Sequence, residues 1–288
     1  MKKKLYLIQL FCFGAIGAVI FSSCGTQNVL TKAKKTGVNL EYSFPNEYNN
    51  YKLVQKMDQE IDAMGQLIEI DNVSEVDFLL KKNSDEGGNV KIDIKVNSVS
   101  MKIETMGQQM GPDLSELDGK DFHMVVSKKG KEVDTHEADE IVYQVSSDEK
   151  SNLGMLFNSF LPDLPDEPVK TGNTWTSQDS LHFKDGDRNT IVVTTNTHTL
   201  NDFIEFEGVN CAEVKTTYEG YLKGNGSSQG APLTFDVKIT GDGTWYFDFE
   251  NGRLIKDSGT GSGDGKISMD MGEMSLKQGF QNTTELIK

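Results

Sequence analysis

The sequence predicts a mainly β fold of twisted antiparallel sheets, arranged as a half-barrel or as stacked sheets, with one central helix. Three observations support this prediction. Apolar and polar residues alternate with a period of two over much of the chain, clusters of Gly, Asn and Asp separate these runs, and only one later segment has apolar residues at helical spacing. A sheet with one apolar face must bury that face, which favours a curved or layered arrangement.

The first element is an apolar amino-terminal segment. Three lysines (residues 2–4) are followed by an apolar run (residues 5–21) and by two serines before Cys24. A basic start, an apolar centre and small residues at the cleavage point are the three parts of an export signal. A membrane-spanning anchor needs about 20 apolar residues, and this run is slightly shorter and contains Gln9. We therefore predict a signal peptide over residues 1–23.

The sequence Phe21-Ser22-Ser23-Cys24 resembles the end of bacterial lipoprotein signal peptides, in which an apolar residue and two small residues precede a Cys. The resemblance implies that the Cys24 sulfur carries a lipid through a thioether, that the chain is cut before it, and that the new amino terminus is acylated, for example by palmitate. Several acyl chains on one residue anchor a protein firmly. The expected partner is thus the membrane, through the lipid on Cys24. The absence of an acidic residue at positions 25–26 implies the outer membrane of a cell envelope.

Residues 24–38 are predicted to form a lipidated flexible tether, because they are polar and basic. The β-rich domain is expected over residues 39–288. Removal of the signal from the 288-residue chain leaves 265 residues, enough for a large β domain. Three of the 29 basic residues and none of the 44 acidic ones lie in the signal, so the mature formal charge is −18. This charge argues against nucleic acid as a partner.

The cysteines predict a fold without disulfides. Cys12 lies in the signal and Cys24 is expected to carry lipid, which leaves Cys211. The fold must therefore rest on its core rather than on covalent links. Cys211 lies among strand-forming residues, where a single Cys usually acts as a small buried apolar group.

The clearest strand covers residues 90–96, in which Val and Ile alternate with polar residues. Up to Val96 the apolar residues have even numbers, whereas after Ser98 they have odd numbers: Val99, Met101 and Ile103. One extra residue in a strand has this effect. We therefore predict a bulge near Ser98 in a long strand.

Two further strands are predicted at residues 233–239 and 245–249. Gly241-Asp242-Gly243 lies between them and is expected to join them as a hairpin. Asn251-Gly252 predicts the next turn, after which the sheet continues.

The one predicted helix covers residues 147–160. Leu153, Leu156, Phe157 and Phe160 share one helical face, and three prolines follow. The proline-rich stretch near residues 161–172 is also a candidate linker between two β halves.

The segment from Pro165 to Trp175 carries a Pro, Val, Gly, Trp series. This series resembles a distinctive motif of an uncharacterised family of exported, β-rich envelope lipoproteins, whose domain has no assigned function. Together with residues 243–257, the resemblance extends over the mature domain from Asn39 onward. It implies a β-rich fold and no particular activity. From the residues themselves, Trp175 is expected to begin a strand and to place its ring in the core.

No catalytic residue, metal ligand or cofactor is predicted. Residues 226–230 match Gly-x-Ser-x-Gly, but a nucleophile elbow requires a helix after the serine, and a strand is expected there. The four histidines have no ligand spacing. Thioethers at Met269, Met271 and Met274 suit Cu(I), yet strand parity explains Met269 and Met271 more simply.

We therefore expect a non-enzymatic lipoprotein of the cell envelope, which binds a ligand or an envelope protein on its concave face. The alternative is a periplasmic carrier of lipid, or of another apolar ligand, in a curved-sheet cavity. Four side chains are expected to line such an apolar site, because thioethers and aromatic rings adapt to apolar ligands: Met101, Phe235, Met269 and Met271. An unfilled apolar space would favour the carrier, and a filled core would favour the binding module.

Overall fold

A computed structural model of the chain describes residues 23–287 except 64, 147–148, 186–187, 229–230 and 271. The predicted signal peptide therefore lies almost wholly outside the described residues. Twelve strands form one sheet in the order β6-β5-β3-β2-β1-β14-β13-β12-β11-β10-β9, with β4 paired to β3, and β7 and β8 form a separate hairpin. The prediction of a mainly β fold is confirmed.

The strands are unusually long. β2 and β11 have 21 and 20 residues, whereas strands of about three to ten residues are usual. The bounds of the strands are β1 (Asn49–Ala63), β2 (Gln66–Glu86), β3 (Asn89–Thr105), β4 (Gln108–Met110), β5 (Asp121–Val126), β6 (Glu132–Asp134), β7 (Val142–Ser146), β8 (Glu149–Asn152), β9 (Thr174–Asp185), β10 (Arg188–Phe206), β11 (Val209–Ser228), β12 (Ala231–Asp248), β13 (Arg253–Met269) and β14 (Gly272–Ile287). The helices are α1 (Ser23–Thr36), η1 (Ser115–Leu117), α2 (His136–Asp139) and α3 (Leu153–Phe157).

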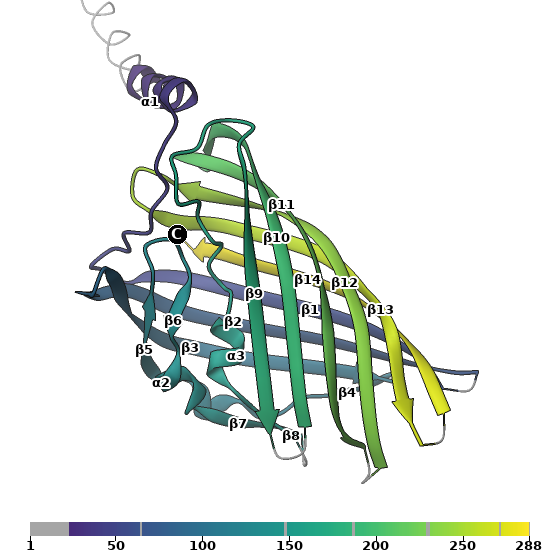
Figure 1. Ribbon diagram of the computed structural model, residues 1–288. Helices are drawn as coiled ribbons and strands as arrows, with labels where there is room; N and C mark the ends of the chain where they lie inside the picture. The colour runs from purple at the N-terminus through teal and green to yellow at the C-terminus, as the bar shows by residue number, and fades with distance from the viewer. Residues whose placement is uncertain are drawn as a thin grey trace, which may run out of the picture.

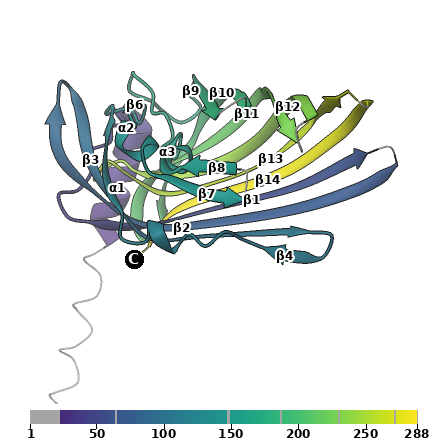
Figure 2. The same cartoon turned by 90° about the horizontal axis from the view of Figure 1, so that it is seen from below.

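Both parts of the chain share the large sheet, because β1 pairs with β14 along its length. Residues 161–172 therefore connect two parts of one sheet. The sheet curves strongly, and α2, α3, β7 and β8 lie inside its concavity (Figures 1 and 2). Of the two predicted arrangements, the half-barrel describes this architecture.

Alternation along each strand separates an apolar face from a charged one. In β12, Trp245 and Phe247 are buried on the concave side, whereas Lys238 and Asp242, at the other parity, are exposed. The same division holds in β1, where Leu53 is buried and Lys56 is exposed. The charged residues of these strands thus lie mainly on the convex face.

The predicted bulge near Ser98 is confirmed. The pairing of β2 with β3 shifts by one residue between the pairs Asp77–Ser98 and Phe78–Val96. The extra residue resets the parity of β3. Val96 and Val99 are consequently both buried.

The predicted hairpin at residues 241–243 is wrong, because β12 runs through these residues without a turn. Gly241 and Gly243 pair with β11 on one side and with β13 on the other. Pairing on both sides of the strand outweighs the local preference of Gly for turns. The turn predicted at Asn251-Gly252 is present, and Gly252 has a φ of 63° there.

The predicted helix over residues 147–160 is much shorter in the structure. Residues Glu149–Asn152 form β8, which pairs with β7, and the helix α3 covers only Leu153–Phe157. The Asn152 side chain accepts a hydrogen bond from the Met155 N–H at 3.0 Å and so caps the helix. Leu153, Leu156 and Phe157 lie in this helix, whereas Phe160 follows it. The predicted start, residues 147 and 148, lies outside the described residues.

We call residues 135–164, which include α2, β7, β8 and α3, the plug. Its main anchor in the concavity is Phe157, which is fully buried. The Phe157 ring lies 5.0 Å from that of Phe78 in β2 and 5.2 Å from that of Phe122 in β5, edge to face in both cases. Phe160 completes the cluster at 5.6 Å from Phe157. Aromatic pairs of this geometry stabilise beyond their area of contact.

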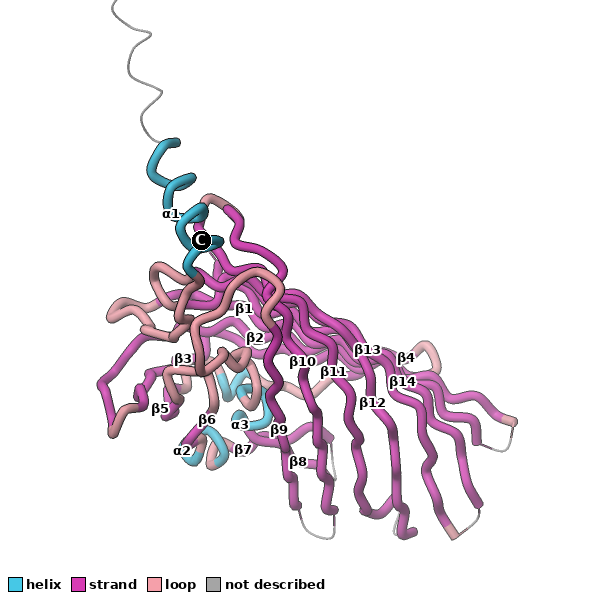
Figure 3. The backbone as a smooth tube through the Cα atoms, turned by 45° about the horizontal axis from the view of Figure 1, so that its top comes forward, coloured by secondary structure: helices cyan, strands magenta, loops and turns pink. Residues whose placement is uncertain are grey.

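Residues 24–38, expected to be a flexible tether, are largely helical in the structure. Ala33 of α1 is buried in the core, and Lys34 forms an ion pair with Asp202 at 2.8 Å. Val38 then pairs with Val169. Figure 3 shows α1 at one end of the sheet. No helix among the described residues has both the length and the apolar character needed to cross a bilayer.

Candidate functional site

The part of the concave face that lies beyond the plug forms a continuous uncharged surface. We call it the distal face. It consists of the inward-facing residues within 55–63, 68–74, 99–105, 218–226, 233–241, 259–269 and 274–282. Not one of these described inward positions is Lys, Arg, Asp or Glu. Many of its apolar side chains are only half-buried, among them Met57, Ile61, Ile70, Ile103, Leu222, Leu233, Ile267 and Met274.

Glycines occupy four successive inward positions of β13: Gly259, Gly261, Gly263 and Gly265. Side chains from neighbouring strands lie over this bare backbone. A Cβ on Gly261 would collide with the Tyr218 hydroxyl and with the Phe280 ring, and a Cβ on Gly263 would lie 2.9 Å from Val237. The glycines therefore allow rings and branched side chains to pack flat where the sheet curves.

The structure places three of the four predicted lining residues. Phe235 and Met269 are near neighbours at the far end of β12 and β13, since Phe235 pairs with Ile267 and Leu233 pairs with Met269. Met101 also faces the concavity, but it lies in β3, away from Phe235 and Met269 in the strand order, and packs against the core cluster. Met271 lies outside the described residues. The three described residues thus all face the concavity, but they do not form one compact site.

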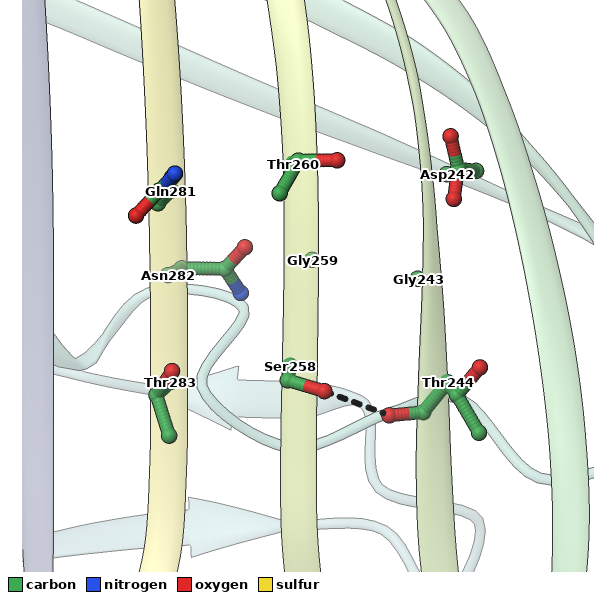
Figure 4. A pocket seen from close by; sticks show the side chains of 9 residues that line it. All are labelled: Asp242, Gly243, Thr244, Ser258, Gly259, Thr260, Gln281, Asn282 and Thr283. Carbon is green, nitrogen blue, oxygen red and sulfur yellow. Dashed lines mark hydrogen bonds between the residues drawn. The ribbon is translucent and has the colours of Figure 1, made fainter.

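Two pockets on the described surface lie largely outside the distal face, with which the first shares Gly259 and Asn282. The first, of about 340 Å³, crosses β12, β13 and β14 and is lined by Asp242, Gly243, Thr244, Ser258, Gly259, Thr260, Gln281, Asn282 and Thr283 (Figure 4). The second, of about 200 Å³, lies between the plug and β9 and is lined by Thr135, Asp139, Asn152, Gly154, Met155, Asn158, Ser180, Leu181 and His182. Both are mainly polar, and neither contains a predicted lining residue.

A buried polar network joins β9, β10, β11 and β12 beside the plug. The His198 ring stacks on Trp175 at 5.2 Å and meets Trp245 edge-on at 6.0 Å. Its Nδ1 lies 2.8 Å from Thr216 Oγ1, which accepts a hydrogen bond from Trp245 Nε1 at 3.0 Å. Burial lowers the pKa of His198 to about 4, so the ring is neutral at neutral pH.

The same histidine contacts a serine, since His198 Nε2 lies 3.1 Å from Ser177 Oγ. A Ser-His-Asp triad needs a carboxylate on the other ring nitrogen, to orient the imidazole and to stabilise its charged form. In this network a threonine hydroxyl takes that place. The low pKa of His198 also makes it a weak base. The geometry therefore suits a structural network better than nucleophilic catalysis.

Three carboxyl groups influence one another where β6 and the plug approach β9, the edge strand, and we call this place the seam: Glu132 of β6, Asp163 of the plug and Asp179 of β9. Burial raises the pKa of Glu132 to about 8, and the charges of Asp179 and Asp163 add to the effect. Burial raises the pKa of Asp163 to about 6, with a further contribution from Asp179. Asp179 has a raised pKa for the same reason and accepts a hydrogen bond from Asn196 at 2.7 Å. The carboxyls thus hold protons more tightly in the folded protein than in the unfolded chain.

The remaining residues that could bind a metal or act as nucleophiles do not come together in one described site. Among the described residues, no three His, Cys, Asp or Glu side chains gather as a metal site. Ser228 ends β11, and β12 begins at Ala231, so a strand follows the Gly-x-Ser-x-Gly segment. Cys211 is fully buried, as predicted. Cys24 belongs to the first turn of α1.

The sequence did not reveal the His198 network or the seam. Ser177, His198 and Thr216 are joined by strand pairing over 18 to 21 residues of sequence. Glu132 and Asp163 approach Asp179 only because β6 and the plug lie against β9 in the folded protein. A run of polar residues at inward parity in β9 and β10 is the one signal that marks the network in advance.

No family model and no curated protein matches this chain. Among solved structures, the chain is similar to DynF from the dynemicin biosynthesis pathway of Micromonospora chersina. The alignment covers 88% of this chain and 91% of that one, with 9% sequence identity and a TM-score of 0.23. A TM-score this low carries no argument about fold or function.

Proposed function

We propose that the chain is a non-enzymatic lipoprotein of the cell envelope, anchored through lipid on Cys24, that binds an apolar ligand on its distal face. The observation that carries the proposal is the distal face itself. Its inward positions are uncharged, whereas the convex side of the same strands carries many charges. Half-exposed apolar side chains lose contact with water when an apolar ligand covers them, at about 25 cal/mol per Å².

The concave face has a part that the plug covers and a part that it leaves open, and this difference supports the proposed binding of an apolar ligand. The plug fills one part with a close aromatic cluster around Phe157. The strands extend well beyond this core, and their apolar positions stay half-exposed there. Half-exposed apolar surface of this extent often marks a binding site. A stable fold alone does not require strands of this length.

The second candidate is a carrier that moves a lipid between membranes. A carrier encloses its ligand, whereas the two described pockets are mainly polar and share only Gly259 and Asn282 with the distal face. The structure therefore favours a binding module with an open face over an enclosed carrier.

The test is native mass spectrometry of the Cys24→Ser protein purified without detergent from its own cell envelope. We expect a bound apolar molecule in addition to the mass of the chain. Ile267→Glu places a charge on the distal face and should remove that molecule, whereas Ser268→Glu, at the opposite parity of the same strand, should retain it. A bare mass for the parent protein, or equal binding by both variants, would contradict the proposal.

A further inference from the structure

The distal face is apolar but carries a band of neutral amide side chains. Gln55 pairs with Asn282 of β14, and Gln59 pairs with Gln278 of the same strand. Asn72 of β2 lies opposite Met57, between the two glutamines of β1. Residues paired across strands have Cβ atoms about 4.5–5.5 Å apart. We call these five residues the amide band.

The amides of this band retain capacity for further hydrogen bonds. Gln59 Nε2 donates to Gln278 Oε1 at 3.4 Å, and Asn282 Nδ2 donates to Asp257 Oδ2 at 3.5 Å. These distances are at the long end for hydrogen bonds, which are usually about 2.9–3.0 Å for N–H···O. A side-chain amide offers two donors and two acceptor lone pairs. A polar group of a ligand could therefore replace or shorten these contacts.

The charged side chains near the amide band favour a ligand whose polar head group is uncharged over one whose head group is an anion. The described inward positions of the distal face contain no Lys or Arg to pair with a phosphate or carboxylate. The carboxyl of Asp257 lies beside the band, where it accepts the hydrogen bond from Asn282. Burial raises the pKa of Asp257 to about 7, so above that pH its charge repels an anion. A buried anion without a partner is strongly disfavoured.

We infer that the ligand is an amphiphile with an acyl chain and an uncharged hydroxyl-rich head, such as a glycerol or sugar ester. The acyl chain lies along the apolar residues near Phe235 and Ile267. The head lies on the amide band, where hydroxyl groups donate to amide oxygens and accept from amide nitrogens. This inference rests on the proposed function and narrows its ligand class.

The test compares ligands that share one chain and differ in the head: 1-decanoylglycerol, decanoate and decyl phosphate. Each is titrated calorimetrically at pH 8 into the Cys24→Ser protein. We expect decanoylglycerol to bind about ten-fold more tightly than either anion, since one lost head-group interaction is worth about 1.4 kcal/mol. Gln278→Leu and, independently, Asn282→Leu should reduce its affinity by a similar factor. Gln281→Leu, on the convex face of the same strand, is the matched control and should leave the affinity unchanged.

Each other outcome has a defined meaning. If an anion binds as tightly as the glycerol ester, or if both band variants bind the ester like the control, the inference is overturned and the proposed function stands. If the parent protein binds none of the three ligands, the apolar-ligand function is overturned together with the inference.

Discussion

Tyr218 lies across the bare backbone of Gly261, two strands away in the sheet. The Tyr218 hydroxyl donates a hydrogen bond to the Thr260 carbonyl oxygen at 2.9 Å, and the Phe280 ring approaches the same glycine from the other side. A side chain at position 261 would occupy the space of both rings. The glycine row of β13 is therefore a packing requirement of the curved sheet.

Gly261→Ala should destabilise the protein by about 1–3 kcal/mol, the usual cost of inserting a group into a packed site. The measurement is the free energy of unfolding in urea. Ser262→Ala changes the next residue of β13, on the exposed convex face, and should change stability by less than about 0.5 kcal/mol. Equal effects of the two substitutions would show that the rings move aside without cost.

The seam should make stability fall as the pH rises. The pKa of Glu132 is raised from 4.5 to about 8 in the folded protein. A raised carboxyl pKa contributes stability that is fully present below pH 4.5 and is lost as the pH rises towards 8. Glu132→Gln keeps an acceptor for the Ser159 N–H and removes the titration. We expect the variant to gain about 4–5 kcal/mol relative to the parent between pH 4.5 and pH 8.5, since each pKa unit is worth about 1.4 kcal/mol.

Urea unfolding across this pH range gives the comparison. The difference in unfolding free energy between Glu132→Gln and the parent, measured at each pH, isolates the titration of this one carboxyl. A difference that stays flat with pH would mean that Glu132 does not hold a proton in the folded state.

Phe157→Ala should loosen the plug, because three aromatic rings lose their common neighbour. Removal of a buried Phe side chain costs about 3–5 kcal/mol. Chemical denaturation measures the total loss, and hydrogen exchange over β8 and α3 shows whether the plug opens before the sheet. Val142→Ala, at a plug residue that is 52% exposed, serves as the control and should be nearly neutral.

Cys24→Ser should abolish stable attachment to the membrane. The expected thioether needs the sulfur, and a protein without its acyl chains has no comparable anchor. Cell fractionation should move the variant out of the membrane fraction, and mass spectrometry of the parent should show an acylated Cys24 as its first residue. Membrane association that persists in the serine variant, or a parent that retains residues 1–23, would contradict the predicted lipid anchor.

Much of the fold could be predicted from the sequence, because alternation is a local property. Residues 90–96 indicated a strand, and the parity change at Ser98 located a bulge that the ladder confirms. Predictions from local sequence failed where the neighbouring strands decide whether a segment forms a strand or a turn. Gly241 and Gly243 resemble a turn in isolation, but β11 and β13 hold them in a strand.

The sequence by itself determined the β class, the apolar and charged parities of the strands, and the prediction of a lipid on Cys24. Only the tertiary structure decided which inward residues are covered. The plug buries Phe78 and leaves Phe235 half-exposed, although both occupy inward strand positions. The proximity of Glu132, Asp163 and Asp179 likewise depends on how β6 and the plug lie against β9. Parity is fixed by neighbours along the chain, whereas burial and pKa depend on residues that are distant in sequence.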